Sequence, residues 1–260
     1  MIEILSPAEV QRGRATGALV GGILQTLKQR SVAGTNLLEI DRWTRQLIAE
    51  AGATSCYLDY APAWADGPFG HAICTGVNDG VLHGKPYDYR LADGDLLSLD
   101  LAVLLDGIAA DAAISFVIGG EPDPESSALI DATERALAAG FAAARPGGRT
   151  GDISHAIGTV LREAGYEVNT DYGGHGIGTV MHQEPPVPND GRASRGYELR
   201  TGMLLAIEPW VMADTAELVT GDDGWTLRSA TGCRTAHTEH TIAITEDGAE
   251  ILTLPSAPGS

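Results

Sequence analysis

Asp100 and Asp111 stand in the segment DLLSLDLAVLLDGIAADAAISFVIG, in which apolar residues alternate with small or polar ones. Asp106 and Gly107 form a preferred two-residue turn between antiparallel strands, so the segment is predicted to be a β-hairpin. The turn sets the register, and the expected pairs are Leu105 with Ile108, Ala102 with Asp111, and Asp100 with Ala113. The two carboxylates then lie diagonally adjacent on one sheet face and can converge.

The face that would carry these aspartates is otherwise small, and its other residues are Ser98, Ala102, Ala109, Ala113 and Ser115. The opposite face carries large apolar residues and is expected to pack in the core. Two like charges on a half-buried face would repel each other and lose hydration, so a divalent metal between them is the economical prediction. The alternative is a solvent-exposed face on which both aspartates are ordinary surface residues.

Glu208 and Glu239 add two carboxylates in strand-like runs. Glu208 is the only charge in MLLAIEPWV, a run that Pro209 terminates, and Glu239 lies between His237 and Thr241 on one face of TAHTEHTIAIT. A lone buried carboxylate needs a partner. Hydrogen bonds or an arginine could satisfy each glutamate structurally, and a metal ion could do the same.

His175 and His182 lie in YGGHGIGTVMHQEP, among several glycines. The stretch is too rich in glycine for a helix and too polar for a buried strand, so we interpret it as a loop whose glycines permit unusual backbone angles and close approach. The residues alone leave three roles open for these histidines: metal ligands, proton carriers or ordinary turn residues.

Four carboxylates and one imidazole offer mainly oxygen ligands with a single nitrogen. This set fits a pair of hard or borderline divalent ions such as manganese, iron or cobalt, and four negative charges would roughly balance two dications. Paired metal ions activate a bridging water and stabilise a tetrahedral intermediate. Hydrolysis is therefore the predicted class of reaction.

Composition favours an ordinary globular protein, with 260 residues of which 43% are hydrophobic and 20% are charged. The net charge of −18 disfavours nucleic acid binding through phosphate neutralisation and accommodates a cationic or metal-bearing partner. No apolar run reaches the roughly 18 residues of a membrane span, and no export signal is visible, so a cytoplasmic protein is predicted. Three cysteines, Cys56, Cys74 and Cys233, lack metal-type spacing and suit a reducing compartment.

The elements that must position these residues form a mixed α+β pattern. Helices are expected from Pro7 to about Arg30, from Asn36 to Gly52, from Pro124 to Ala144 and from Gly151 to Ala164, and strands at 72–77, 96–105, 108–118, 203–211 and 237–245. One domain is predicted over residues 1–252, followed by a flexible tail at 253–260. The loop YAPAWADGPFG, residues 60–70, carries three aromatic residues that could line a pocket or fold back on the surface.

The chain resembles the short-form type I methionine aminopeptidases over nearly its whole length. The resemblance is carried by LSPAEVQRGRATG, NDGVLHGKP, LLSLDLAVLLDGIAADAAISFVIG, GGHGIGTVMHQEP, AIEPW, DGWTLR and TEHTIAIT, in the family's order and approximate spacing. GHGIG alone is a weak signal, but the ordered set is specific. It implies the pita-bread fold of these metallopeptidases: a curved antiparallel sheet with outer helices and a central dinuclear metal site.

The resemblance also implies roles for individual residues. Asp100, Asp111, His175, Glu208 and Glu239 match the family's five metal ligands. In the family pattern Asp111 and Glu239 bridge two divalent cations, Asp100 serves one of them, and His175 with Glu208 serves the other. The metal is expected to be cobalt, manganese or iron.

Further positions match active-site residues that are not ligands. His83 and His182 match two histidines that contact substrate and assist proton movement or stabilise the intermediate, and Glu208 matches the family's usual candidate for accepting the water proton. Cys74 and Trp225 match the methionine pocket; the alternatives are a small buried hydrophobic residue and a core aromatic residue. The chain departs from the common bacterial pattern at the 60–70 loop, at Met181, where the pattern has an aromatic residue, and at Trp210, where it has methionine.

The implied reaction is attack by a metal-bridging water or hydroxide on the first peptide bond, which removes the N-terminal methionine of nascent proteins and peptides. The expected partner is that N-terminal methionine, with transient proximity to the ribosome. Neither direct nucleic acid binding nor membrane association is expected, and a monomer is expected. The rivals are a proline-specific pita-bread peptidase, which usually carries an additional N-terminal domain, and a non-catalytic pita-bread binding protein, which typically loses ligands.

Overall fold

The computed structural model describes residues 2–255. The four expected helices are confirmed, with ends close to the predicted ones: α1 (Pro7–Arg30), α2 (Leu37–Glu50), α3 (Pro124–Ala143) and α4 (Thr150–Glu163). Helix α1 begins with the capping box that its sequence predicts, because the Ser6 hydroxyl accepts from the Glu9 N–H while the Glu9 carboxylate accepts from the Ser6 N–H. Within residues 2–255, no helix combines the length and the apolar character needed to cross a membrane.

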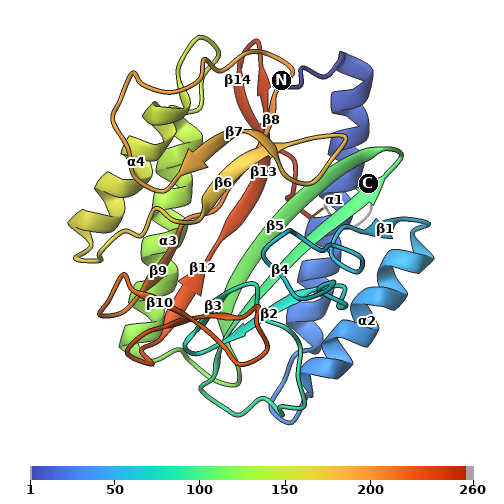
Figure 1. The fold of residues 1–260 in the computed structure, drawn as a ribbon, viewed down its shortest axis with the longest axis vertical. Helices are drawn as coiled ribbons and strands as arrows, with labels where there is room; N and C mark the ends of the chain where they lie inside the picture. Colours follow the sequence, from blue (N-terminus) through green and yellow to red (C-terminus); the bar gives the residue numbers. More distant parts are fainter. Residues whose placement is uncertain (1, 256–260) are drawn as a thin grey trace.

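A large antiparallel sheet forms the centre of the molecule, with α1 and α2 on one flank and α3 and α4 on the other (Figure 1). Its strand order is β1 (Thr54–Ser55), β4 (Leu96–Leu105), β5 (Ile108–Val117), β13 (Glu239–Thr245), β8 (Leu204–Ile207), β6 (Gly173–Ile177) and β7 (Gln183–Pro188). Strand β2 (Cys74–Val77) also pairs with β4, and β14 (Gly248–Ile251) pairs with β13. Two smaller sheets contain β10 (Leu218–Thr220), β11 (Leu227–Ser229) and β3 (Gly80–Leu82), and β12 (Thr235–His237) with β9 (Trp210–Met212).

The predicted hairpin of β4 and β5 is confirmed in its register. Asp100 is opposite Ala113, and Asp111 is opposite Ala102. The turn residue Asp106 has φ 49° and is followed by Gly107 with φ 79°, the left-handed pair that a two-residue hairpin turn requires. Both aspartates therefore lie on the same face of the sheet.

The large apolar face of the hairpin packs as expected. Its residues Leu97, Leu99, Leu101 and Val103 are fully buried in one cluster with apolar side chains of α1 and α2. A second cluster joins α3 and α4 to β8 and β13. Because both clusters cover the face opposite the aspartates, the helices leave the face with the small residues open for a site.

The glycine-rich stretch around His175 was predicted to be a loop, and this prediction was wrong, because Gly173–Ile177 forms β6 between β8 and β7. A Cβ atom on Gly174 would lie 2.3 Å from the Ala206 carbonyl oxygen, and one on Gly176 would lie 2.2 Å from the Glu184 carbonyl oxygen. Neither glycine has a positive φ. The glycines therefore serve close approach between strands and not unusual backbone angles.

The strands predicted at 203–211 and 237–245 are each broken into two. Strand β8 ends at Ile207 and β9 begins at Trp210, since Pro209 has no N–H for a continuous ladder. The second break lies at Thr238, whose N–H donates to the Pro209 carbonyl oxygen at 3.1 Å. The two breaks thus lie side by side, with Glu208 in the first break and Glu239 directly after the second.

At the end of the described chain, Thr253 is buried, and its hydroxyl lies 2.8 Å from His240 Nδ1. Packed structure therefore reaches residue 253, one position beyond the predicted domain boundary. Residues 256–260 of the predicted tail lie outside the described residues, and the division at residue 252 stays a prediction.

Thr241 joins β13 to β5 next to Asp111. The ladder between these strands is short, with pairs at Glu239 to Ala113 and His240 to Ala112. Beyond it, the Thr241 hydroxyl accepts from the Asp111 N–H and donates to the Asp111 carbonyl oxygen, both at 2.8 Å. The Thr241 side chain therefore takes the place of a backbone partner for Asp111, one of the predicted metal ligands.

Replacing Thr241 by valine should destabilise the fold by about 2–3 kcal/mol, because two buried backbone groups of Asp111 lose their partner. Thr159→Val is the matched control, since the Thr159 hydroxyl bonds only to the His155 carbonyl of its own helix; its effect should stay below about 0.5 kcal/mol. Urea unfolding monitored by circular dichroism measures both. Equal effects of the two variants would contradict the assigned role of Thr241.

Candidate active site

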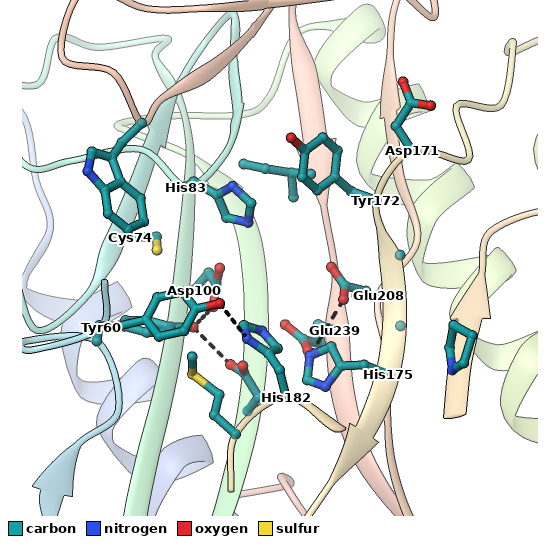
Figure 2. A pocket seen from close by; sticks show the side chains of 18 of the residues that line it. Tyr60, Cys74, His83, Asp100, Asp171, Tyr172, His175, His182, Glu208 and Glu239 are labelled. Carbon is teal, nitrogen blue, oxygen red and sulfur yellow. Dashed lines mark hydrogen bonds and ion pairs between the residues drawn. The ribbon is translucent and has the colours of Figure 1, made fainter. Parts of the chain in front are cut away.

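The five predicted metal ligands come from neighbouring strands of the large sheet. Asp100 lies on β4, Asp111 on β5, Glu239 at the start of β13, Glu208 directly after β8, and His175 on β6. Ala113 of β5 explains the convergence, because it pairs with Asp100 on one side and with Glu239 on the other. In Figure 2 the side chains of Asp100, Glu208, Glu239 and His175 point into one region of the pocket.

The five side chains, together with His182, form three overlapping groups; within each group the ligand atoms lie within 4.8 Å of one another. The groups are Asp100, Asp111 and Glu239; His175, Glu208 and Glu239; and Asp111, His175 and His182. Asp111, Glu239 and His175 each belong to two groups. The structure therefore brings together all five predicted ligands and adds His182 at the edge of the set.

The carboxylates are held out of bulk water without a compensating cation from the chain. Asp111 and Glu239 are 3% and 2% exposed, and the Oε1 atom of Glu239 has no hydrogen-bond partner. Among residues 2–255, no lysine or arginine forms an ion pair with any of the four carboxylates. The alternatives in which the aspartates are ordinary surface residues, or an arginine satisfies the glutamates, do not describe this site.

Burial and mutual repulsion disfavour the charged forms of these carboxyl groups. Burial raises the pKa of Asp100 to about 6, and burial with the charge of Asp100 raises the pKa of Glu208 to about 8. Burial and neighbouring carboxylates raise the pKa of Asp111 and of Glu239 well above their usual values. A divalent cation would relieve both effects at once, so the donor set fits a metal.

His175 presents the nitrogen that such a site needs. Its Nδ1 atom lies 2.9 Å from the Gly176 carbonyl oxygen, so Nδ1 carries the proton and Nε2 keeps its lone pair. Nε2 lies 3.8 Å from Glu208 Oε1. Burial lowers the pKa of His175 to about 3, and His182 contributes to the shift, which keeps the imidazole neutral.

His182 and His83 both line the same cavity but differ in their contacts. His182 Nδ1 lies 3.2 Å from the Tyr60 hydroxyl, and its ring centroid is 4.3 Å from that of His175. His83 has φ 52° and lies between two aromatic rings, with the Trp64 centroid at 6.3 Å and the Tyr172 centroid at 5.3 Å. Burial lowers the pKa of His83 to about 4, and desolvation lowers the pKa of His182.

The cavity beside the carboxylates has a volume of about 490 Å³. Cys74 and Trp225 line it, together with Tyr60, Trp64, Phe69 and Met181. The aromatic residues of the 60–70 loop therefore line a pocket, in which Phe69 is buried and Trp64 is 58% exposed. Trp210, the other departure from the family pattern, packs in a separate apolar cluster with Val81, Leu82, Met212 and Leu227.

Two residues at the site received no role from the sequence. The Tyr57 hydroxyl lies 2.5 Å from Asp100 Oδ1 and 3.1 Å from Asp111 Oδ1. His237 is buried, and its Nε2 lies 3.8 Å from Glu208 and 4.0 Å from Glu239. The strand alternation that places His237 on the face of Glu239 was a usable signal, whereas no local pattern connects Tyr57 to the hairpin.

The comparisons with known proteins agree with this geometry. The family model described as metallopeptidase family M24 matches residues 12–246. Methionine aminopeptidase 1 of Mycobacterium tuberculosis is 41% identical over 256 residues, which cover 96% of this chain and 94% of that protein.

Solved structures show the same relationship. A methionine aminopeptidase structure from Thermotoga maritima is 34% identical and superposes with a TM-score of 0.92, covering 98% of this chain and all of that one. The prolidase from Pyrococcus furiosus has the same fold at a TM-score of 0.74 and 20% identity, but this chain covers only 66% of it. The expected pita-bread fold and the hydrolase class are confirmed. The chain belongs to metallopeptidase family M24.

Proposed function

We propose that the protein is a methionine aminopeptidase that removes the N-terminal methionine from nascent proteins and peptides. One observation carries the proposal: four carboxylates and a neutral imidazole converge at a cavity whose other walls are aromatic and sulfur-containing. The carboxylates and the imidazole fit metal-assisted hydrolysis, and the aromatic and sulfur-containing walls fit the thioether side chain of methionine. The full-length similarity to methionine aminopeptidases supports the same activity.

We further propose that the five ligands hold two divalent cations. Asp111, Glu239 and His175 each belong to two groups, but only the two carboxylates have a second oxygen that could serve a second ion, which supports bridging roles for Asp111 and Glu239. Asp100 would then complete one site and His175 with Glu208 the other. When bound, the ions would activate water and polarise the scissile carbonyl. The ligand types suit cobalt, manganese or iron.

Side chains of the protein would accept the proton of the attacking water and hydrogen-bond to the substrate. The Glu208 carboxylate lies at the cavity wall and would accept the water proton. His83 and His182 would donate hydrogen bonds to the peptide carbonyl oxygen. Because desolvation keeps both imidazoles neutral, they add no positive charge near the free α-amino group of the substrate.

The free α-amino group would restrict cleavage to chain ends. Only the first residue of a peptide carries this group, and the ion-loaded site would hold it, whereas an internal peptide bond has no amine to be held. The methionine side chain would then extend to Cys74, Phe69, Met181 and Trp225. We place the activity in the cytoplasm, on nascent chains near the ribosome, and expect a monomer with no direct contact to nucleic acid, in line with the net charge of −18.

The activity assay uses the full chain loaded separately with manganese, iron and cobalt. It should release free methionine from Met-Ala-Ser and leave an X-Pro dipeptide intact, because the pocket favours a thioether side chain. Chromatographic quantification of free amino acids measures both reactions. Cleavage of the proline peptide alone would reject the proposed specificity in favour of a proline-specific peptidase.

Asp111→Asn and His182→Ala separate the ligands from the substrate-facing histidines. Asp111→Asn should lose bound metal and activity together, because it removes a shared carboxylate charge. His182→Ala should retain metal and lose kcat. Metal content after gel filtration, measured by elemental analysis, accompanies the rate measurement. Loss of metal from His182→Ala would mean that His182 is itself a ligand, as its proximity to Asp111 and His175 permits.

Trp225→Ala tests the methionine pocket. Opening the aromatic wall should lower kcat/KM for Met-Ala-Ser by at least about tenfold, since shape changes of a hydrophobic pocket have effects of this order. Trp43→Phe is the control, because Trp43 is a residue of α2 that packs against the core cluster of α1 and α2, away from the cavity. Steady-state kinetics measures both variants. An unchanged kcat/KM in Trp225→Ala would exclude Trp225 from the specificity pocket.

A further inference from the structure

Tyr57 follows β1 and has its side chain in the wall of the cavity. The residue is 6% exposed, and its ring packs edge-on against Phe69 with centroids 5.8 Å apart. Its backbone is fixed on both sides, because the Tyr57 N–H donates to Ser55 Oγ at 3.1 Å and the Tyr60 N–H donates to the Tyr57 carbonyl oxygen at 3.0 Å. The position of the hydroxyl is therefore set by packing that does not involve the carboxylates.

That hydroxyl contacts one oxygen of each hairpin aspartate. The distance to Asp100 Oδ1 is 2.5 Å, in the range of a charge-assisted hydrogen bond, and the distance to Asp111 Oδ1 is 3.1 Å. A phenol has one proton, so the short contact is the donated bond and the longer one is a secondary contact. The phenol oxygen thus links β4 to β5 at the point where their carboxylates converge.

We propose that Tyr57 is a positioning residue for the metal centre, which holds the Asp100 carboxylate in the orientation that binds the ion. This inference rests on the proposed dinuclear site. The terminal torsion of an aspartate is soft, so an unrestrained carboxylate would lose orientational freedom when an ion binds. A hydrogen bond to Oδ1 removes that freedom beforehand and leaves Oδ2 for the cluster. Outer partners of this kind typically change metal affinity by 10–100-fold.

A second tyrosine provides a matched comparison outside the cavity. The Tyr89 hydroxyl lies 2.9 Å from Asp95 Oδ2, which is the same pair of groups at a similar distance. Asp95 belongs to none of the three groups that could hold a metal. Removing either hydroxyl deletes one tyrosine–aspartate hydrogen bond, but only Tyr57 bonds to a proposed ligand.

The test compares metal binding by the full-length wild type, Tyr57→Phe and Tyr89→Phe after removal of bound metal. Calorimetric titration with manganese chloride and, separately, with cobalt chloride gives the dissociation constants. The dissociation constant of the more tightly bound of the two ions should rise about 10–100-fold in Tyr57→Phe. In Tyr89→Phe it should stay within about twofold of the wild-type value. The visible absorption bands of bound cobalt should shift only in Tyr57→Phe, because only there does the ligand geometry change.

A rescue variant separates hydrogen bonding from ring packing. Incorporation of 4-aminophenylalanine at position 57 keeps a neutral donor at the same place and should restore the affinity to within about threefold of wild type. Circular dichroism and thermal unfolding of the metal-free variants verify that each is folded. The rescue variant remains an independent comparison if Tyr57→Phe itself is unfolded.

The outcomes distinguish this inference from the proposed function. A dissociation constant for Tyr57→Phe within twofold of wild type, or an equal loss in Tyr89→Phe, would overturn the positioning role and leave the metal centre intact. A 4-aminophenylalanine variant as weak as Tyr57→Phe would also overturn it. A wild-type chain that binds neither manganese nor cobalt would instead overturn the metal centre itself, and the positioning role with it.

Discussion

The confinement of four carboxylates to one sheet face is the constraint on which the rest of the structure depends. Each carboxylate withdrawn from water loses hydration energy, and each neighbour of the same charge adds repulsion. No lysine or arginine of residues 2–255 pairs with them, so the chain itself does not neutralise the face. The fold must therefore be stabilised elsewhere, and the apolar clusters beneath the hairpin and beneath β8 and β13 provide that stability.

The constraint acts through strand register more than through loops. Ala113 faces Asp100 across one ladder and Glu239 across the other, so a one-residue slip of either strand would send a carboxylate to the core face. Small residues beside the aspartates leave room for an ion and a substrate. Glu208 differs from Glu239, because it lies in the break between β8 and β9, where backbone pairing no longer fixes the direction of the side chain and the carboxylate can turn toward the hairpin.

The sequence was sufficient for the parts of the fold that local rules determine. The hairpin followed from its Asp-Gly turn and strict alternation, and the helices followed from caps and apolar spacing. Strand β6 was missed because its glycines carry no side chains, which removes the alternation that identifies a strand. Tyr57 was missed for a different reason: its contact with Asp100 depends on where β1 docks along β4, a long-range pairing with no local signature.

The two histidines of the glycine-rich segment illustrate how contacts can separate residues that look equivalent. Their ring centroids are 4.3 Å apart, and each has a nitrogen within 4.8 Å of an Asp111 carboxylate oxygen, so proximity does not assign their roles. The hydrogen-bond partner of Nδ1 distinguishes them. In His175 this partner is a backbone carbonyl oxygen, which fixes the proton on Nδ1 and leaves Nε2 facing the carboxylates. In His182 it is a tyrosine hydroxyl, which can donate or accept, so both tautomers remain open. A fixed tautomer suits a ligand, and an adjustable one suits a group that exchanges hydrogen bonds with a substrate during a reaction.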